Sequence, residues 1–314
     1  MLRFMILRIS LMLITLLVVS ISIFAIMEIL PGDVAQAMLK ATATPERLAL
    51  VREELGLNSP AHVRYLDWVG GVMQGDLGDS YFIKRPIAEI LPRRLFHSTV
   101  LALFALLFGM PIAVIAGVWA GVRPDTLGDR LVSVIGLVGI SLPEFVTGVL
   151  LMLFFASTLH WLPPSSVMLP GETPLTRPAI LVMPALTLTG VLFAYVMRMT
   201  RANVMEVMQS HYVRTAVLKG MPMRQVVLRH VLPNSMLPTI TIIAMNFGWM
   251  LGGLIIVENV FSYPGLGQLL LQAMVTQDVP LLEVLALLVA TTYAFSNLAA
   301  DLSYAALDPR IRVS

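Results

Sequence analysis

The residues that commonly perform catalysis are scarce in this chain, and their neighbours form no catalytic motif. There is no cysteine, and none of the five histidines is followed by glutamate, which excludes an HExxH zinc site. None of the three lysines follows a glycine, so the Gly-Lys step of a nucleotide-binding P-loop is excluded. Ser141 lies in GISL rather than in the GxSxG pattern of a serine nucleophile. We therefore expect no catalytic residue, no metal site and no cofactor site in this chain.

Glu144 lies within a long apolar stretch, in the segment GISLPEF. A carboxylate at the middle of a bilayer costs about 2.5 to 3.5 kcal/mol on insertion scales, so this side chain should face a bundle interior or a wet cavity. Two interpretations stay open, a structural carboxylate bonded to a neighbouring helix and a residue that lines a transport path. Pro143, which frees a backbone carbonyl, and Asn246 are the other candidates for lining such a path.

The stretch from Tyr212 to Pro233, YVRTAVLKGMPMRQVVLRHVLP, is basic and only weakly apolar, and it separates two long apolar runs. We expect a short helix that ends at Gly220 in the left-handed conformation, followed by a second helix that Pro222 opens and Pro233 closes. The small residues of this hairpin would let the backbone of a partner come close, and they are Thr215, Ala216 and Gly220. The alternative is a solvated basic loop that fixes topology and touches anionic lipids.

The composition indicates the elements that must position these residues. Hydrophobic residues make up 57% of the 314, charged residues only 13%, and the mean hydropathy is +0.84, whereas soluble domains are about a quarter charged. This predicts an all-α, multi-pass membrane protein surrounded by lipids. The net charge is only +2, and most basic residues flank apolar runs, so topology explains the sequence pI of 9.0 better than a nucleic-acid partner does.

Six stretches are apolar and long enough to cross a bilayer of about 30 Å as helices. The predicted spans are residues 9–30, 98–118, 131–156, 179–197, 237–257 and 281–304. Residues 31–97 form the one large polar segment before the second span, for which amphipathic patterning predicts a helical cap on the outer face. Residues 198–236 form the basic loop, and the whole chain, 1–314, is expected to be a single transmembrane domain.

The basic residues predict the orientation of these spans. With the N-terminus inside, the cytoplasmic segments hold twelve, and they are Arg3, Arg8, Arg123, Arg130, Arg198, Arg201, Arg214, Lys219, Arg224, Arg229, Arg310 and Arg312. The two short outer loops hold only Arg177, and long segments such as 31–97 translocate largely regardless of charge. Both termini and the basic loop are therefore expected in the cytoplasm.

The basic loop resembles the cytoplasmic coupling motif of ABC importer permeases, Glu-Ala-Ala, three residues, Gly, nine residues, Ile, any residue, Leu-Pro. Ala216, Gly220, Leu232 and Pro233 match its spacing, while Arg214, Thr215 and His230 depart from it. The Tyr-Val-Arg-Thr-Ala version resembles the dipeptide, oligopeptide and nickel branch of these permeases. Four further segments are similar to that branch, and they are QGDLG (74–78), GISLP (139–143), PGLG (264–267) and LDPR (307–310).

This resemblance implies the type I ABC importer fold, in the cytoplasmic (inner) membrane of a bacterium. It implies four kinds of partner: a second homologous permease, two ATP-binding cassette subunits that bind ATP and Mg, an external substrate-binding protein, and the membrane lipids. Coupling to the ATPase is expected at Arg214, Thr215, Ala216, Lys219 and Gly220. The substrate would be a small peptide, and glutathione, nickel and opine-like compounds are the alternatives within the class.

A proton-coupled secondary transporter is the alternative from another class. It would use carboxylates at membrane depth, such as Glu144 and Asp301, to carry protons, and it predicts transport by this chain alone. Six predicted spans without an evident internal repeat favour a half-transporter that needs a second subunit.

Overall fold

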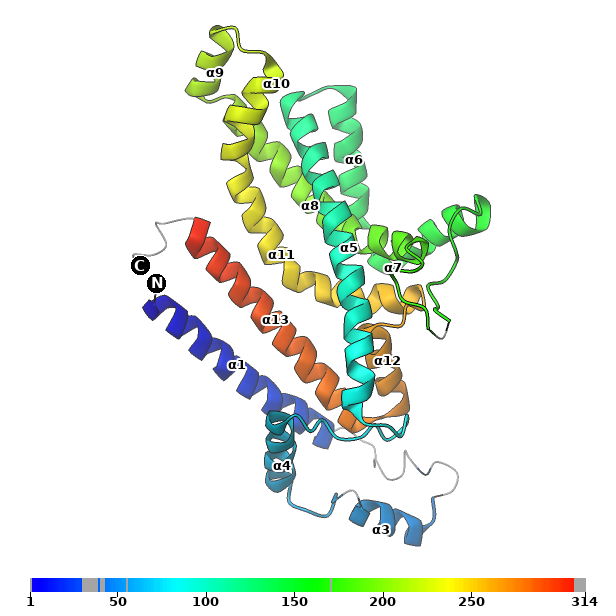
Figure 1. Ribbon diagram of the computed structural model, residues 1–314. Helices are drawn as coiled ribbons and strands as arrows, with labels where there is room; N and C mark the ends of the chain where they lie inside the picture. The colour runs from blue at the N-terminus through cyan, green and yellow to red at the C-terminus, as the bar shows by residue number, and fades with distance from the viewer. Residues whose placement is uncertain (1, 30–38, 40–42, 55, 170, 308–314) are drawn as a thin grey trace. The chain divides into compact units, whose positions relative to one another are not determined.

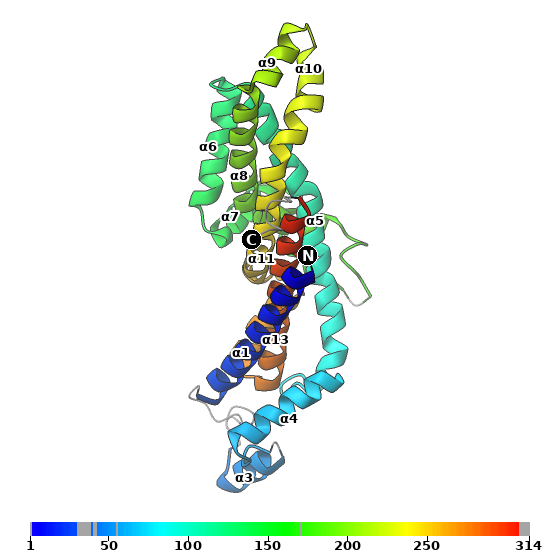
Figure 2. The ribbon, with the colours of Figure 1, turned by 90° about the vertical axis from the view of Figure 1, so that its left-hand side faces the viewer.

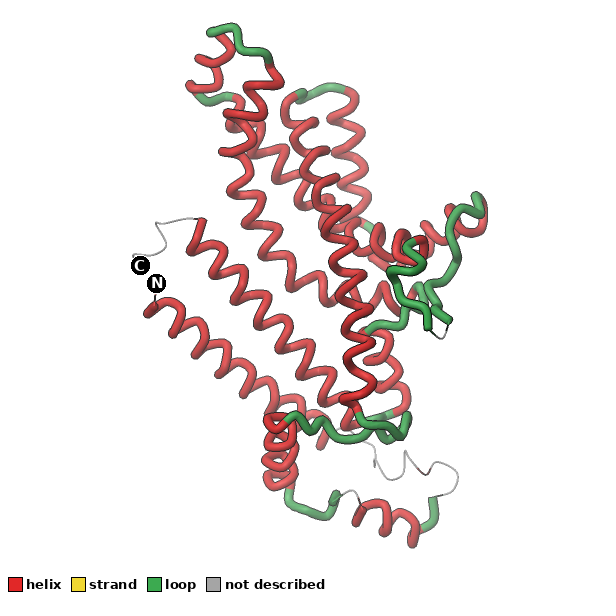
Figure 3. Tube along the Cα trace, in the orientation of Figure 1, coloured by secondary structure: helices red, strands yellow, loops and turns green. Residues whose placement is uncertain are grey.

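The chain folds into α-helices. The computed structural model describes residues 2–29, 39, 43–54, 56–169 and 171–307 (Figure 1), and within these ranges there is no β-strand, only an isolated bridge between Asp79 and Pro86 (Figure 3). The prediction of an all-α protein is confirmed. Contacts divide the chain into two compact units, Met1–Ser98 with Pro264–Phe295 (unit 1) and Thr99–Tyr263 with Ser296–Ser314 (unit 2). Two long helices contribute residues to both units, α5 (Ile87–Val122) and α13 (Val279–Leu307).

Unit 1 contains the helices of the predicted outer segment. Besides its parts of α5 and α13, it contains α1 (Leu2–Ile29), α3 (Pro45–Glu54), α4 (Ala61–Gln74) and α12 (Leu266–Thr276). The rings of Phe24, Tyr65 and Trp68 have centroids 5.5 to 6.4 Å apart and join α1 to α4, and Arg64 forms an ion pair with Glu28. The amphipathic α4 is therefore attached to the end of the first apolar helix.

A fully buried aspartate, Asp278, holds a loop of unit 1 in place. Its Oδ2 accepts hydrogen bonds from the Ser80 hydroxyl at 2.5 Å and from the Phe82 amide at 3.1 Å, and its Oδ1 accepts from the Tyr81 amide at 3.1 Å. The Ser80 hydroxyl in turn accepts from the Ile83 amide at 3.0 Å. This network fixes the loop between α4 and α5 to the connection between α12 and α13.

Unit 2 is built around α8 (Ala179–Met208), whose residues form much of the buried core. Its other elements are α6 (Leu127–Ser141), α7 (Glu144–Leu151), the π-helix η2 (Met152–Thr158), α9 (His211–Leu218), α10 (Met223–Val226), the π-helix η3 (Val227–Val231) and α11 (Leu232–Val260). On α5, Gly117 lies so close to α8 that a β-carbon there would be 2.6 Å from the Met197 carbonyl oxygen. The core therefore depends on close approach of these two helices.

Within the described part of the chain, four helices are each long and apolar enough to cross a membrane: α1 from Met5, α5, α8, and α13 as far as Ala299. The bent pair of α6 with α7 and η2 would make a fifth, and the predicted span 237–257 falls within α11, where many side chains are not described. The count of six spans stays a prediction. The helix α5 begins at Ile87, so the last residues of the predicted outer segment, 31–97, form the first turns of this helix.

The predicted third span, 131–156, is not one straight helix. The axis of α6 meets that of the α7 and η2 pair at 115°. Leu142, which precedes Pro143, is extended with φ −94° and ψ 132°, because the proline ring disfavours helical backbone at the residue before it. We expected Pro143 to free a carbonyl within a span, and it ends one helix and begins another.

Candidate functional site: the hairpin between α8 and α11

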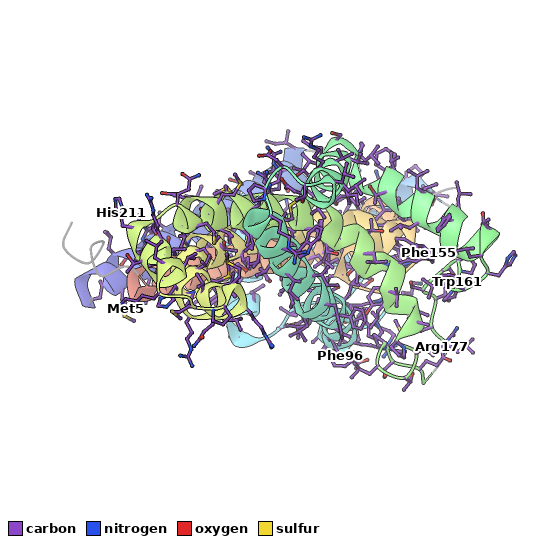
Figure 4. The ribbon with its side chains drawn as sticks, turned by 90° about the horizontal axis from the view of Figure 1, so that it is seen from above. Met5, Phe96, Phe155, Trp161, Arg177 and His211 are labelled. Atoms are coloured by element: carbon purple, nitrogen blue, oxygen red, sulfur yellow. The ribbon has the colours of Figure 1, made fainter. Side chains whose placement is uncertain are left out.

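The hairpin from α9 to α10 lies at one end of unit 2, where α8 ends and α11 begins (Figure 2). Ser210 has an extended backbone, and α9 then runs from His211, which Figure 4 labels, to Leu218. Gly220 has φ +76°, and the Met221 amide donates to the Ala216 carbonyl at 3.3 Å, a bond that closes the helix end. The expected short helix and the left-handed glycine are both confirmed.

The second half of the hairpin continues into α11, so the prediction that Pro233 closes a helix is wrong. Pro222 precedes α10 as expected, but α10, η3 and α11 follow one another without a loop. Pro233 lacks the N–H that an α-helix uses, and the wider η3 turn lets the Leu232 amide donate to the Val227 carbonyl instead. The Asn234 side-chain amide donates to the His230 carbonyl at 2.8 Å. These bonds let the backbone continue through the proline.

One face of α9 packs into unit 2, and this corrects the expectation that Ala216 is exposed. Val213 and Ala216 are buried in a cluster that also contains Val204 of α8. Valines from α10 and η3 complete the cluster, and Val118 and Val122 of α5 pack against it. A mechanical load on α9 would therefore act directly on α5 and α8.

The opposite face of the hairpin is exposed and mixes positive charge with apolar side chains. Of the predicted coupling residues, Arg214, Thr215, Lys219 and Gly220 are exposed. The exposed large apolar side chains of the same hairpin are Tyr212, Val217, Leu218, Met223 and Leu228. The Thr215 hydroxyl donates to the His211 carbonyl at 2.9 Å, so this group stabilises α9 itself. A short helix with such a face is suited to lie in the groove of another protein.

Glu144 is the first residue of α7 and is buried, with its carboxylate against α11. A β-carbon on Gly253 would lie 2.8 Å from Glu144 Oε1 and 2.9 Å from Oε2, so the carboxylate packs directly against the backbone of α11 at this glycine. Glu144 Oε2 is buried and has no hydrogen-bond partner within the described residues. Pro143 is exposed, and the side chain of Asn246 lies outside the described residues. The structure therefore brings Glu144 to a neighbouring helix, and a role in lining a path stays a prediction.

Sequence reasoning missed a bidentate ion pair in unit 2. Asp129 of α6 receives two hydrogen bonds from Arg201 of α8, from Nε to Oδ1 at 2.5 Å and from Nη2 to Oδ2 at 2.7 Å. Arg201 entered the sequence argument only as one of twelve basic residues, and Asp129 did not enter it. No local pattern could have identified this pair, because the two residues are 72 positions apart.

Comparison with known proteins shows which family the chain matches. The family described as "Binding-protein-dependent transport system inner membrane component" matches residues 93–313, and the corresponding N-terminal family matches residues 1–102. The glutathione transport system permease protein of Salmonella typhimurium is 37% identical over 302 residues, 95% of each chain. A probable peptide ABC transporter permease protein of Sinorhizobium fredii is 34% identical over 299 residues, 94% of each chain. The corresponding glutathione permease protein of Escherichia coli is 36% identical, again over 95% of each chain.

Proposed function

Since the chain belongs to the binding-protein-dependent transport system inner membrane components, we propose that it is one of two similar permease subunits that together form the path for a small peptide-like substrate. The family assignment makes the chain a multi-pass permease subunit of an ABC importer and a transport component without catalytic activity. Its resemblance to the peptide permease branch is confirmed. The family also implies ATPase and substrate-binding partners.

The observation that carries the mechanism is the two-faced helix α9. Its inner face packs on α5 and α8, and its outer face carries the exposed residues Arg214, Thr215 and Lys219. We propose that this outer face lies in a groove of one of two ATPase subunits, which bind the ATP and Mg. Closure of the ATPases would move α9 and the helices beneath it, and the path would alternate between outward and inward access. Both termini and the hairpin would then lie in the cytoplasm.

For the substrate we propose a small peptide, including peptides of the glutathione kind. The support is the naming of the relatives, of which some are glutathione permeases and one is a probable peptide permease. An external binding protein, docked on the outer loops, would deliver the substrate. Purification of the assembled importer, followed by binding assays of its external protein with dipeptides, longer peptides, glutathione and nickel, tests this directly. Binding of nickel alone, or of none of these ligands, would overturn the peptide assignment and leave the importer assignment intact.

Gly220 offers a test of the coupling role with a matched control. Its φ of +76° strains any residue with a β-carbon by about 1 to 2 kcal/mol, although no atom lies within 4 Å of the added carbon. Asparagine tolerates this conformation better than other residues that carry a β-carbon. We expect Gly220→Val to lower substrate uptake per ATP hydrolysed in reconstituted vesicles, whereas Gly220→Asn stays close to wild type. Equal uptake and equal stimulation of the ATPase in both variants would contradict the coupling role.

The whole assignment depends on partners, so their recovery is the decisive measurement. An affinity pull-down from the native membrane should recover a P-loop ATPase and a second permease. Recovery of this chain alone, still able to transport in liposomes under a proton gradient, would instead support a proton-coupled secondary transporter.

A further inference from the structure

The contact between Asp129 and Arg201 is built as a clamp. Asp129 is 2% exposed, and besides the two bonds from Arg201 its Oδ2 accepts from the Asp125 amide at 2.9 Å. The Asp129 amide donates to the hydroxyl of Thr126, the residue that caps α6, at 3.3 Å. Two parallel bonds from one guanidinium fix both the distance and the angle between the groups, which a lysine cannot do. The clamp therefore fixes the start of α6, together with the turn that leads into it, on α8.

The same short segment of α8 carries contacts to three other elements of unit 2. On the side of α5, a β-carbon at Gly121 would lie 2.8 Å from the Arg201 carbonyl oxygen. On the side of α11, the hydroxyls of Thr200 and Thr239, both fully buried, lie 3.4 Å apart. Val204 is in the buried cluster beneath α9. Within about one turn, α8 thus contacts α5, α6, α9 and α11.

Of these contacts, the clamp is the polar one that reaches α6, at the start of that helix. Further along, α6 packs closely on α8, where a β-carbon on Gly139 would lie 3.1 Å from the Gly190 carbonyl oxygen. The valine cluster connects α9 with α5, α8, α10 and η3, and none of its members belongs to α6. The helix α6 leads to the 115° bend at Leu142 and Pro143, beyond which Glu144 lies against α11. A displacement of α9 acts on α5 and α8 through this cluster. Without the bidentate bond, the start of α6 would lose its polar attachment to α8, and the packing of the two helices nearer the bend would remain.

We propose that the Asp129–Arg201 clamp is a positioning element of energy coupling, which makes α6 move with α8 when α9 is displaced. This inference rests on the proposed function, because it needs a partner that displaces α9. Asp129 and Arg201 act through α6 and α8 and touch neither nucleotide nor substrate. The bidentate geometry, rather than the charge of Arg201, is the required property.

The test uses the assembled importer, purified with its partners and reconstituted in vesicles. The variants are Asp129→Asn and Arg201→Lys. Their matched controls are Asp79→Asn and Arg130→Lys, which change the same residue types at exposed positions outside the clamp. The measured quantity is the number of substrate molecules taken up per ATP hydrolysed, together with the ATPase rate that the loaded binding protein stimulates. Coupling free energies between sites correspond to factors of about 5 to 150.

We expect Arg201→Lys and Asp129→Asn to lower uptake per ATP about fivefold or more while most of the stimulated ATPase rate remains. The controls should stay within about twofold of wild type, well below the smallest coupling factor. A fold defect alone would reduce the amount of importer, and with it ATPase and uptake in proportion, so it would leave the ratio unchanged. The exchange of both residues, Asp129→Arg with Arg201→Asp, restores two opposed groups and should recover part of the ratio.

An unchanged ratio in Arg201→Lys and Asp129→Asn would overturn the inference. Failure of all three clamp variants to assemble would also overturn it, because the pair would then serve assembly rather than coupling. The proposed function fails differently, through absence of an ATPase partner from the wild-type preparation or uptake that does not need ATP. Failure of the inference is thus distinguishable from failure of the proposed function.

Discussion

Two buried aspartates, one in each unit, hold their surroundings by different means. Asp278 in unit 1 accepts from two backbone amides and a serine hydroxyl, and all of these donors come from one loop. Asp129 in unit 2 is bound chiefly by the guanidinium of Arg201 on another helix. A carboxylate that accepts hydrogen bonds from the amides of one loop fixes the shape of that loop. A carboxylate that accepts hydrogen bonds from an arginine on another helix fixes two helices relative to one another.

The difference has a consequence for mutation. The amides of Tyr81 and Phe82 are present whatever side chains the loop carries, so the network around Asp278 depends mainly on that one carboxylate. The clamp in unit 2 depends equally on two side chains, and each can be changed separately. Removal of Asp278 should therefore lower the free energy of unfolding more than removal of either residue of the clamp. Removal of Arg201 and removal of Asp129 should differ, because the residue that remains is buried to a different extent in each case.

The largest effect is expected for Asp278→Ala. It leaves one buried hydroxyl and two part-buried amides without their acceptor, at about 1 to 3 kcal/mol each, so the free energy of unfolding should fall by about 4 kcal/mol or more. Asp79→Ala, at an exposed position of the same loop, is the control. Thermal unfolding in detergent, followed by loss of monodisperse protein, measures both. Equal melting temperatures for the two variants would show that the network around Asp278 does not hold the loop.

An intermediate effect is expected for the clamp, and it should be larger for Arg201→Ala than for Asp129→Ala. Loss of Arg201 leaves a carboxylate that is 3% exposed without its cation, and broken buried ion pairs cost about 3 to 5 kcal/mol. Loss of Asp129 leaves an arginine whose side chain is 27% exposed and can turn toward water or lipid headgroups. The same unfolding assay compares the two variants. A larger loss of stability in Asp129→Ala than in Arg201→Ala would mean that Asp129 acts mainly by stabilising the start of α6.

The smallest effect is expected for Arg85→Gln. Arg85 and Glu89 form an exposed ion pair one helical turn apart at 2.9 Å, with side chains 62% and 56% exposed. Such pairs contribute about 0.3 to 0.5 kcal/mol, and salt screens them. The melting temperature should shift by no more than the error of the assay, and any shift should be smaller at high salt than at low salt. A clear loss of stability would show that solvent exposure does not separate this pair from the clamp.

Part of the site could be predicted because its causes are local. Glycine tolerates the left-handed conformation that ends α9 at Gly220, and Pro222 fixes its own φ, so the end of α9 and the start of α10 follow from residue type. Pro233 shows the limit of such rules. The rule that proline ends a helix fails there, since the π-helix η3 leads directly into α11 and the backbone continues through the proline. The residue type alone does not predict this change of helix type.

The sequence by itself determined the class of protein: long apolar helices, no nucleotide-binding or catalytic motif, and a basic hairpin whose spacing resembles a coupling motif. These properties depend on composition, side-chain chemistry and local backbone preference. Only the tertiary structure decided that Ala216 faces inward, that the apolar stretch around Pro143 bends by 115°, and that Asp129 meets Arg201. The physical reason is distance along the chain, because burial and ion pairing depend on which surfaces meet after folding, and residues 72 positions apart share no local signal.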